Sequence, residues 1–162
     1  MSADGRIGLP EGPPGPFACA MLALAGGLAG SALRGGCEWL AVALDLAPWV
    51  ARAAVNVTGA FAIGVLVARI ALLDDRGAPA GVPSRRRGVE HLLGAGLLGG
   101  YTTVSGFALD AAAAVAASNL ARAATIMLVD GGVGIAAVGL GFAMGMAWRR
   151  RLDRAAHLRR PA

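Results

Sequence analysis

The chain has 162 residues, of which 56% are hydrophobic and 15% are charged, and its mean hydropathy is +0.62. A soluble domain of this size needs a polar shell, and so few charged residues cannot supply one. The charges are also bunched, which leaves long uncharged tracts of the length that a bilayer requires. The composition therefore argues against a soluble domain and indicates an integral membrane protein.

The basic excess, a formal net charge of +5 in which all fifteen basic residues are arginine, does not indicate nucleic-acid binding. The aromatic content is 5%, and no recognition motif accompanies the arginines. In a membrane protein, basic segments are better interpreted as signals of orientation. An enzyme is disfavoured as well, because His91 and His157 lack the spacing of metal ligands and the sequence carries no ATP-binding motif or redox group.

Four apolar tracts follow one another along the chain, and each is long enough for one membrane-spanning helix. The first reaches this length if Arg34 snorkels to the membrane surface, the second continues across Arg69, and the fourth is interrupted only by Asp130. The tracts cover residues 17–33, 53–73, 92–109 and 123–148. They are apolar on every face, whereas the helices of a soluble alanine-rich bundle carry polar faces. We predict an all-α transmembrane domain of four helices over residues 17–148.

Three polar segments lie outside the tracts. Residues 1–16 hold four prolines and show no signal-peptide pattern, so we expect a disordered cytoplasmic tail. Residues 74–91 hold prolines, glycines and three consecutive arginines, a composition that predicts a cytoplasmic loop. Residues 149–162 are expected to form a basic cytoplasmic tail.

The arginines also indicate the orientation of the spans. Arg6, Arg76, 85–87 and 149–151 fall on one side of a four-span chain. The two short loops on the other side are expected to hold Glu38, Asp45, Arg52, Asp110 and Arg122. The positive-inside rule then places both termini in the cytoplasm, for a protein of the bacterial inner membrane.

Small residues recur at four-residue spacing within three of the tracts. In lipid, such positions allow helix backbones to approach closely, and dispersion then holds the helices together. We therefore expect close helix contacts at Gly26/Gly30, Ala60/Gly64 and Gly141/Gly145.

Two polar features inside the tracts are candidates for function, because polar groups in a bilayer are expensive. The amide of Asn56 could donate to a dehydrated anion or could form an interhelical hydrogen bond. In the third tract, Gly99-Gly100-Tyr101 is followed by Thr102, Thr103 and Ser105, a poor composition for a regular helix. A broken helix there could offer carbonyls to a cation; otherwise the hydroxyls would bond back to the backbone of a kinked span.

Residues 99–107 resemble the signature Gly-Gly-X-Thr-Thr-Phe-Ser-Thr-Phe of the Fluc (CrcB) fluoride channels. Residues 26–34 (GGLAGSALR) and 55–61 (VNVTGAF) match further segments of that family in the same order. The resemblance covers about residues 17–148. It implies an antiparallel dimer of four-helix subunits with two pores, a broken third helix and one structural sodium ion. It places this sodium on the backbone carbonyls of Gly99 and Thr102.

The resemblance also implies roles for individual side chains. Asn56 becomes a donor in the fluoride pore, with Thr103 and Ser105 as further hydroxyl donors. Phe107 becomes a ring whose positively polarised edge meets the anion. Arg34 is a candidate for holding anions at a vestibule, and it is equally compatible with a topology anchor.

The sequence departs from the family pattern at several of these positions. The first pore phenylalanine is Val104 and the threonine before the second is Gly106, while Ile126 and Asp130 replace a tyrosine and a serine of the last helix. The lead-in to the pore asparagine reads Arg52-Ala53-Ala54. An ionised carboxylate facing an anion path would repel fluoride, so one pore-lining face is altered.

The leading hypothesis is a passive, fluoride-selective channel subunit that exports fluoride and relieves its toxicity, driven by a membrane potential worth about 2.3 kcal/mol per charge per 100 mV. The alternative is a non-conducting subunit that helps to assemble or orient a related channel chain. A small multidrug exporter is disfavoured, because the first span lacks an intramembrane carboxylate. Since the strong arginine bias allows one orientation only, we predict a heterodimer with a homologous subunit of opposite orientation.

Overall fold

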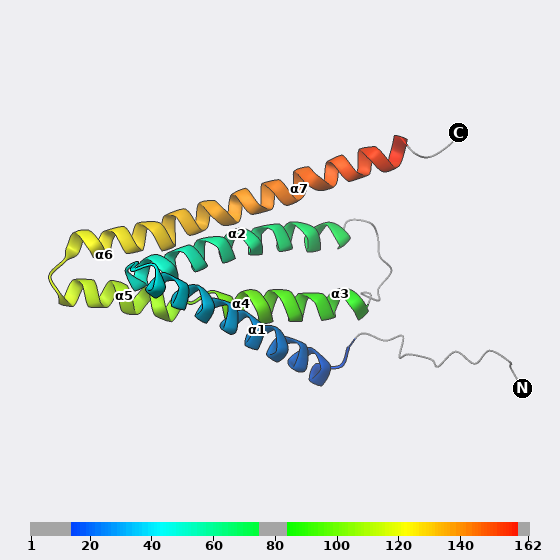
Figure 1. Cartoon of the computed structure of the whole chain (residues 1–162). Coiled ribbons are helices and arrows are strands. Elements are labelled where there is room, and N and C mark those ends of the chain that lie inside the picture. The colour runs from blue at the N-terminus through cyan, green and yellow to red at the C-terminus, as the bar shows by residue number, and fades with distance from the viewer. Residues whose placement is uncertain (1–13, 75–83, 159–162) are drawn as a thin grey trace, which may run out of the picture.

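A computed structural model describes residues 14–74 and 84–158 of the chain as a bundle of long helices (Figure 1). The first two spans are α1 (Pro16–Ala43) and α2 (Pro48–Asp74). The third span comprises α3 (Ser84–Val89), the π-helix η1 (Glu90–Leu98), α4 (Gly99–Tyr101) and α5 (Val104–Ala116). The fourth comprises α6 (Leu120–Met127), the π-helix η2 (Leu128–Val133) and α7 (Gly134–Leu158).

Four helical stretches are long and apolar enough to cross a membrane: Pro16–Ala43, Pro48–Ile70, Arg87–Ala116 and Leu120–Trp148. Each coincides with one of the four apolar tracts of the sequence, and the described residues contain no strand. The predicted all-α membrane fold with four spans is therefore confirmed. The expectations for residues 1–13, 75–83 and 159–162 lie outside the described residues.

The ends of the helices differ from those that hydropathy suggested. Residues 84–91, expected in the loop, are helical, and α1 continues past Arg34 to Ala43, so that Arg34 lies within the helix and not at its end. Four charged residues expected in the two short loops also lie in helices: Glu38, Arg52, Asp110 and Arg122. An apolar window marks the part of a helix that needs lipid, but charged residues with good helix propensity extend the helix beyond it.

Glycines allow close backbone contact between two pairs of helices: α1 with the third span, and α2 with α7. A Cβ on Gly30 of α1 would lie 2.1 Å from the carbonyl oxygen of Leu97 in the third span, and one on Gly26 would lie equally close to the carbonyl of Leu92. A Cβ on Gly64 of α2 would lie 2.1 Å from the carbonyl oxygen of Val138 in α7. No side chain fits at such distances, so the backbones themselves are in contact. The close packing predicted at these glycines is confirmed.

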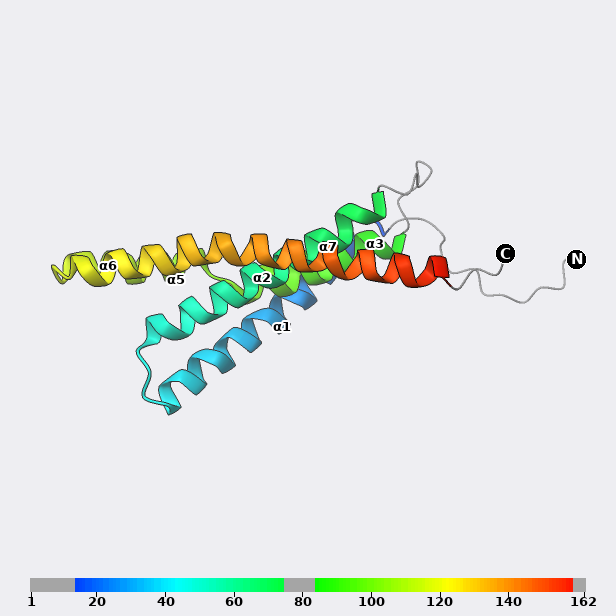
Figure 2. The same ribbon diagram turned by 90° about the horizontal axis from the view of Figure 1, so that it is seen from above.

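The helix ends are sorted between two sides of the molecule. The N-terminal end of α1, the C-terminal ends of α2 and α7, and α3 all lie on the right of Figure 1, and the view from above in Figure 2 agrees. The turn between α1 and α2 and the turn between α5 and α6 lie on the other side. This is the arrangement expected of a chain that crosses a bilayer an even number of times.

Candidate functional site

The third span is interrupted between α4 and α5. Thr102 (φ −79°, ψ 157°) and Thr103 (φ −146°, ψ 109°) have extended backbones, and a regular helix resumes at Val104. The hydroxyl of Thr103 accepts a hydrogen bond from the N–H of Gly106 at 3.1 Å. Thr103 is thus the N-cap of α5, a role for which threonine is well suited.

The interruption changes the hydrogen bonding of two carbonyls. In a continuous α-helix the N–H of Thr103 would donate to the carbonyl of Gly99, and that of Gly106 to the carbonyl of Thr102. Here the N–H of Thr103 donates to the side chain of Asn56 at 2.8 Å, and that of Gly106 donates to the Thr103 hydroxyl. The carbonyls of Gly99 and Thr102, the residues predicted to hold a sodium ion, have both lost their helical donors.

Asn56 of α2 is hydrogen-bonded to both neighbouring spans. Its Oδ1 accepts from the N–H of Thr103, and its Nδ2 donates to the carbonyl oxygen of the same residue at 3.1 Å. Nδ2 also donates to Oδ1 of Asp130 at 2.6 Å. The interhelical hydrogen bonds that the sequence left open as one alternative for Asn56 are therefore present, and they stabilise the interruption by satisfying its backbone.

Asp130 lies in η2, where the fourth span adopts π-helical hydrogen bonding between α6 and α7. A π-helical turn contains more residues than an α-helical one, and such turns occur often at functional sites. The half-buried Asp130 points to Asn56 from this segment. The sequence identified Asp130 as a departure from the family pattern but gave no partner for it.

A cavity of about 300 Å³ lies beside the interruption. It brings together three of the predicted fluoride-binding residues, Asn56, Thr103 and Phe107, with two of the departures from the family pattern, Val104 and Asp130. The remaining lining residues are Ala60, Ile63, Thr102, Gly131 and Val138. An amide, hydroxyls and an aromatic ring thus converge on one hollow whose other walls are apolar.

Not every predicted residue lies at this cavity. The hydroxyl of Ser105 is 3.2 Å from that of Thr103, but Ser105 is exposed and does not line the hollow. Gly99 and Arg34 also lie outside its lining. Phe107 is half-buried, and beyond the cavity it packs against the buried cluster of Ala114, Ala123 and Ile126.

An ion pair that was not predicted from the sequence joins Arg52 of α2 to Asp110 of α5. Both nitrogens Nε and Nη2 of Arg52 donate to the carboxylate of Asp110. Arg52 and Asn56 are four residues apart and so share one face of α2, which makes two polar contacts with the third span. The four-residue spacing of Arg52 and Asn56 was the sequence signal for this polar face. The expectation that Arg52 and Asp110 lie in loops hid the ion pair between them.

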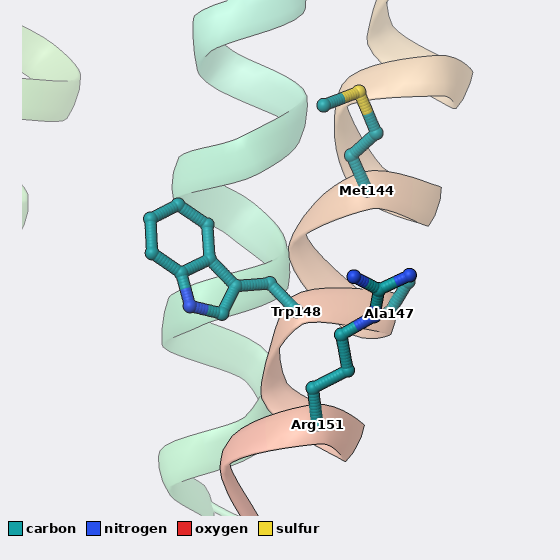
Figure 3. Close-up of a pocket in the computed structure, with 4 residues that line it drawn as sticks. All are labelled: Met144, Ala147, Trp148 and Arg151. Atoms are coloured by element: carbon teal, nitrogen blue, oxygen red, sulfur yellow. The ribbon is translucent and has the colours of Figure 1, made fainter.

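A second hollow, of about 460 Å³, lies near the C-terminal end of α7 and contains none of the predicted site residues (Figure 3). It is lined by Met144, Ala147, Trp148 and Arg151. The indole of Trp148 points toward α2, and the guanidinium carbon of Arg69 lies 4.6 Å from its ring centroid. This cation–π contact joins α2 to α7.

Comparison with known proteins identifies the family. Residues 21–142 match the family described as "CrcB-like protein, Camphor Resistance (CrcB)". The chain is 37% identical over 132 residues to a protein of Leifsonia xyli subsp. xyli named Fluoride-specific ion channel FluC 2. The match covers 78% of this chain and 83% of that protein. Proteins named Fluoride-specific ion channel FluC are 30% identical over 126 residues in Beijerinckia indica (76% of this chain, 93% of that protein) and 34% identical over 125 residues in Allorhizobium ampelinum (74% and 90%). Together with the four membrane-spanning helices, these matches show that the chain is a multi-pass membrane protein that belongs to the CrcB family.

Proposed function

We propose that the chain is a subunit of a passive channel that carries fluoride out of the cytoplasm. The observation that carries this proposal is the cavity at the interrupted third span, because Asn56, Thr103 and Phe107 meet there. Fluoride that enters a membrane must exchange its hydration shell for other donors. An amide, a hydroxyl and the edge of an aromatic ring are groups that can supply them.

A non-conducting partner subunit is the less favoured alternative. The relatives that match over most of the chain are themselves named as fluoride channels, and the cavity retains the donors that such a channel would use. The departures at Val104 and Asp130 affect the same cavity, and they bear on how well it conducts.

The interruption also supports a structural sodium ion. The carbonyls of Gly99 and Thr102 have lost their helical donors to Asn56 and to the Thr103 hydroxyl, and carbonyls of unwound helices coordinate sodium in membrane proteins. These residues therefore fit a sodium ion. When bound, it would stabilise the interrupted span and would not itself be transported.

We further propose an antiparallel dimer with a homologous subunit of opposite orientation, in the bacterial inner membrane. The N-terminal end of α1 and the C-terminal ends of α2 and α7 lie on one side (Figure 1), and the arginine-rich segments of the sequence flank these ends. The positive-inside rule places that side in the cytoplasm. Within such a dimer Ser105, which is exposed in the single chain, would face the pore, and the half-buried Arg34 would hold anions at a vestibule.

Fluoride efflux from liposomes tests the proposal. Vesicles loaded with potassium fluoride would contain the purified chain, alone or with a homologous subunit of opposite charge bias, and an electrode would record fluoride release. We expect release only after a potassium ionophore compensates the charge, with little chloride release under the same conditions. Absence of fluoride release both alone and with the partner would contradict the channel.

Tags on each terminus test the orientation. We expect a single orientation in cells and poor fluoride release by the chain alone. Robust release by the chain alone, with tags detected on both sides of the membrane, would contradict the heterodimer and leave the channel function intact.

A further inference from the structure

The orientation of the Asn56 amide is fixed by the interruption of the third span. The N–H of Thr103 requires an acceptor, and it finds Oδ1 of Asn56 at 2.8 Å. Nδ2 is then held on the opposite side of the amide, where its first hydrogen meets the carbonyl oxygen of Thr103. One hydrogen remains for an anion in the cavity.

Asp130 takes this remaining hydrogen. Its Oδ1 lies 2.6 Å from Nδ2 of Asn56 and accepts a hydrogen bond from it. An amide nitrogen has two hydrogens, so both donors of Asn56 are in use. Asp130 and Asn56 both line the cavity of about 300 Å³, and the carboxylate therefore lies where an anion bound to Asn56 would lie.

The charge of Asp130 has no ion-pair partner among the described residues. Arg52, four residues before Asn56 on the same face of α2, is bound through two nitrogens by Asp110. Asp130 is left with the neutral amide of Asn56 as its hydrogen-bond partner. A carboxylate in this position repels a second anion in the same cavity. The charge of Arg52 interacts with Asp130 only at longer range, and Asp110 already neutralises most of it.

We propose that Asp130 is a built-in anion that competes with fluoride for the amide of Asn56 and so limits fluoride binding in this subunit's cavity. The inference rests on the proposed channel function and adds to it the residue that sets the affinity of the site. Removing the carboxylate would free one Nδ2 hydrogen of Asn56 for fluoride. It would also remove the electrostatic repulsion between the carboxylate and fluoride.

Fluoride binding by the purified full-length chain tests this inference independently of transport. The thermal unfolding midpoint in detergent would be followed against sodium fluoride, with sodium chloride at equal concentration as the reference. Asp130→Asn removes the charge and keeps the shape, and Asp130→Ala also removes the acceptor at Asn56. Asp45→Asn, at the exposed turn after α1, changes the net charge equally and is the matched control.

We expect fluoride to stabilise both Asp130 variants at about tenfold lower concentration than the unmodified chain, since a hydrogen bond to a charged competitor is worth roughly that much in affinity. Asp45→Asn should behave like the unmodified chain. An equal response to fluoride in all four proteins would overturn the inference. Loss of folding in both Asp130 variants would also overturn the inference, because Asp130 would then be required for folding.

Fluoride efflux then separates this inference from the function on which it rests. If the chain is a channel, the Asp130 variants should also release fluoride faster. If no protein releases fluoride, with or without a partner subunit, the channel function fails, while the difference in stabilisation by fluoride still decides the role of Asp130.

Discussion

Arg52 and Asp110 form a two-point ion pair that ties α2 to the part of the third span beyond its interruption. The side chains retain 24% and 12% of their accessible surface, and both residues belong to helices long and apolar enough to cross a membrane. In such surroundings a charge without its partner is costly. The pair therefore fixes how the second and third spans lie against each other.

We predict that Asp110→Asn lowers the unfolding free energy in detergent micelles by about 3 kcal/mol, because it leaves the arginine uncompensated. The double variant Arg52→Gln/Asp110→Asn should lose less than the sum of the two single variants, since two amides can bond to each other. Additive losses in this double-mutant cycle would show that the two side chains are not coupled.

Asn56→Leu should lower both fluoride efflux and stability. The leucine supplies no donor for an anion, and it leaves the N–H and carbonyl of Thr103 without the partners that Asn56 provides. A lost hydrogen bond to a charged group is worth about 1.5–3 kcal/mol, so efflux should fall about tenfold or more. Asn119→Leu, which removes an amide from the N-cap of α6, is the control. Unchanged efflux in Asn56→Leu would restrict Asn56 to helix packing.

Phe107→Leu should reduce fluoride efflux several-fold while the chain still folds. Leucine fills much of the same space beside the cluster of Ala114, Ala123 and Ile126, but it has no ring edge to present to the anion, a contribution of about 0.5–1.5 kcal/mol. Phe142→Leu, in α7 and outside the cavity lining, controls for a general loss of aromatic packing. Equal efflux in the two variants would argue against contact between fluoride and Phe107.

Two glycines of α7 provide a matched test of helix packing. A Cβ on Gly141 would lie 2.1 Å from the carbonyl oxygen of Phe61, whereas a Cβ on Gly139 would meet nothing within 4 Å. Gly141→Ala should therefore lower the unfolding temperature by separating α2 from α7. Gly139→Ala should leave it unchanged or raise it, because alanine favours a helix by up to about 1 kcal/mol. A similar effect of both substitutions would show that α2 and α7 do not depend on this contact.

The number of spans could be predicted from the sequence, because each bilayer crossing requires an apolar tract of minimum length. The helix ends could not be predicted in the same way. Arg52 and Asp110 interrupt the apolar pattern and were assigned to loops, yet each satisfies the charge of the other inside a helix. A hydropathy scale scores each residue separately. A charge within a membrane-spanning helix is tolerated only when its partner is present as well, so the scale does not recognise this ion pair.

The candidate site, like the fold, could be predicted only in part from the sequence. Of the residues that the sequence motifs indicated, Asn56, Thr103 and Phe107 line the cavity together, whereas Gly99 and Ser105 do not. The hydrogen bond between Asn56 and Asp130 joins residues 74 positions apart, and it depends on a π-helical turn that no composition rule predicts. That both hydrogens of the Asn56 amide are already bonded, to Thr103 and to Asp130, follows only from the three-dimensional structure.

The interruption at Thr102 and Thr103 also makes the third span two rods and not one. The rod before it packs against α1 through η1 and α4, while the rod after it packs against α6. The N–H of Thr102 still donates to the carbonyl of Leu98, but that of Thr103 donates to the side chain of Asn56, so the tilt of one rod does not determine the tilt of the other. The unbroken α2 contacts both rods and the joint: Thr58 lies 3.1 Å from the hydroxyl of Tyr101 in α4, Asn56 bonds to Thr103 at the joint, and Arg52 pairs with Asp110 in α5. That helix therefore sets the angle between the two rods.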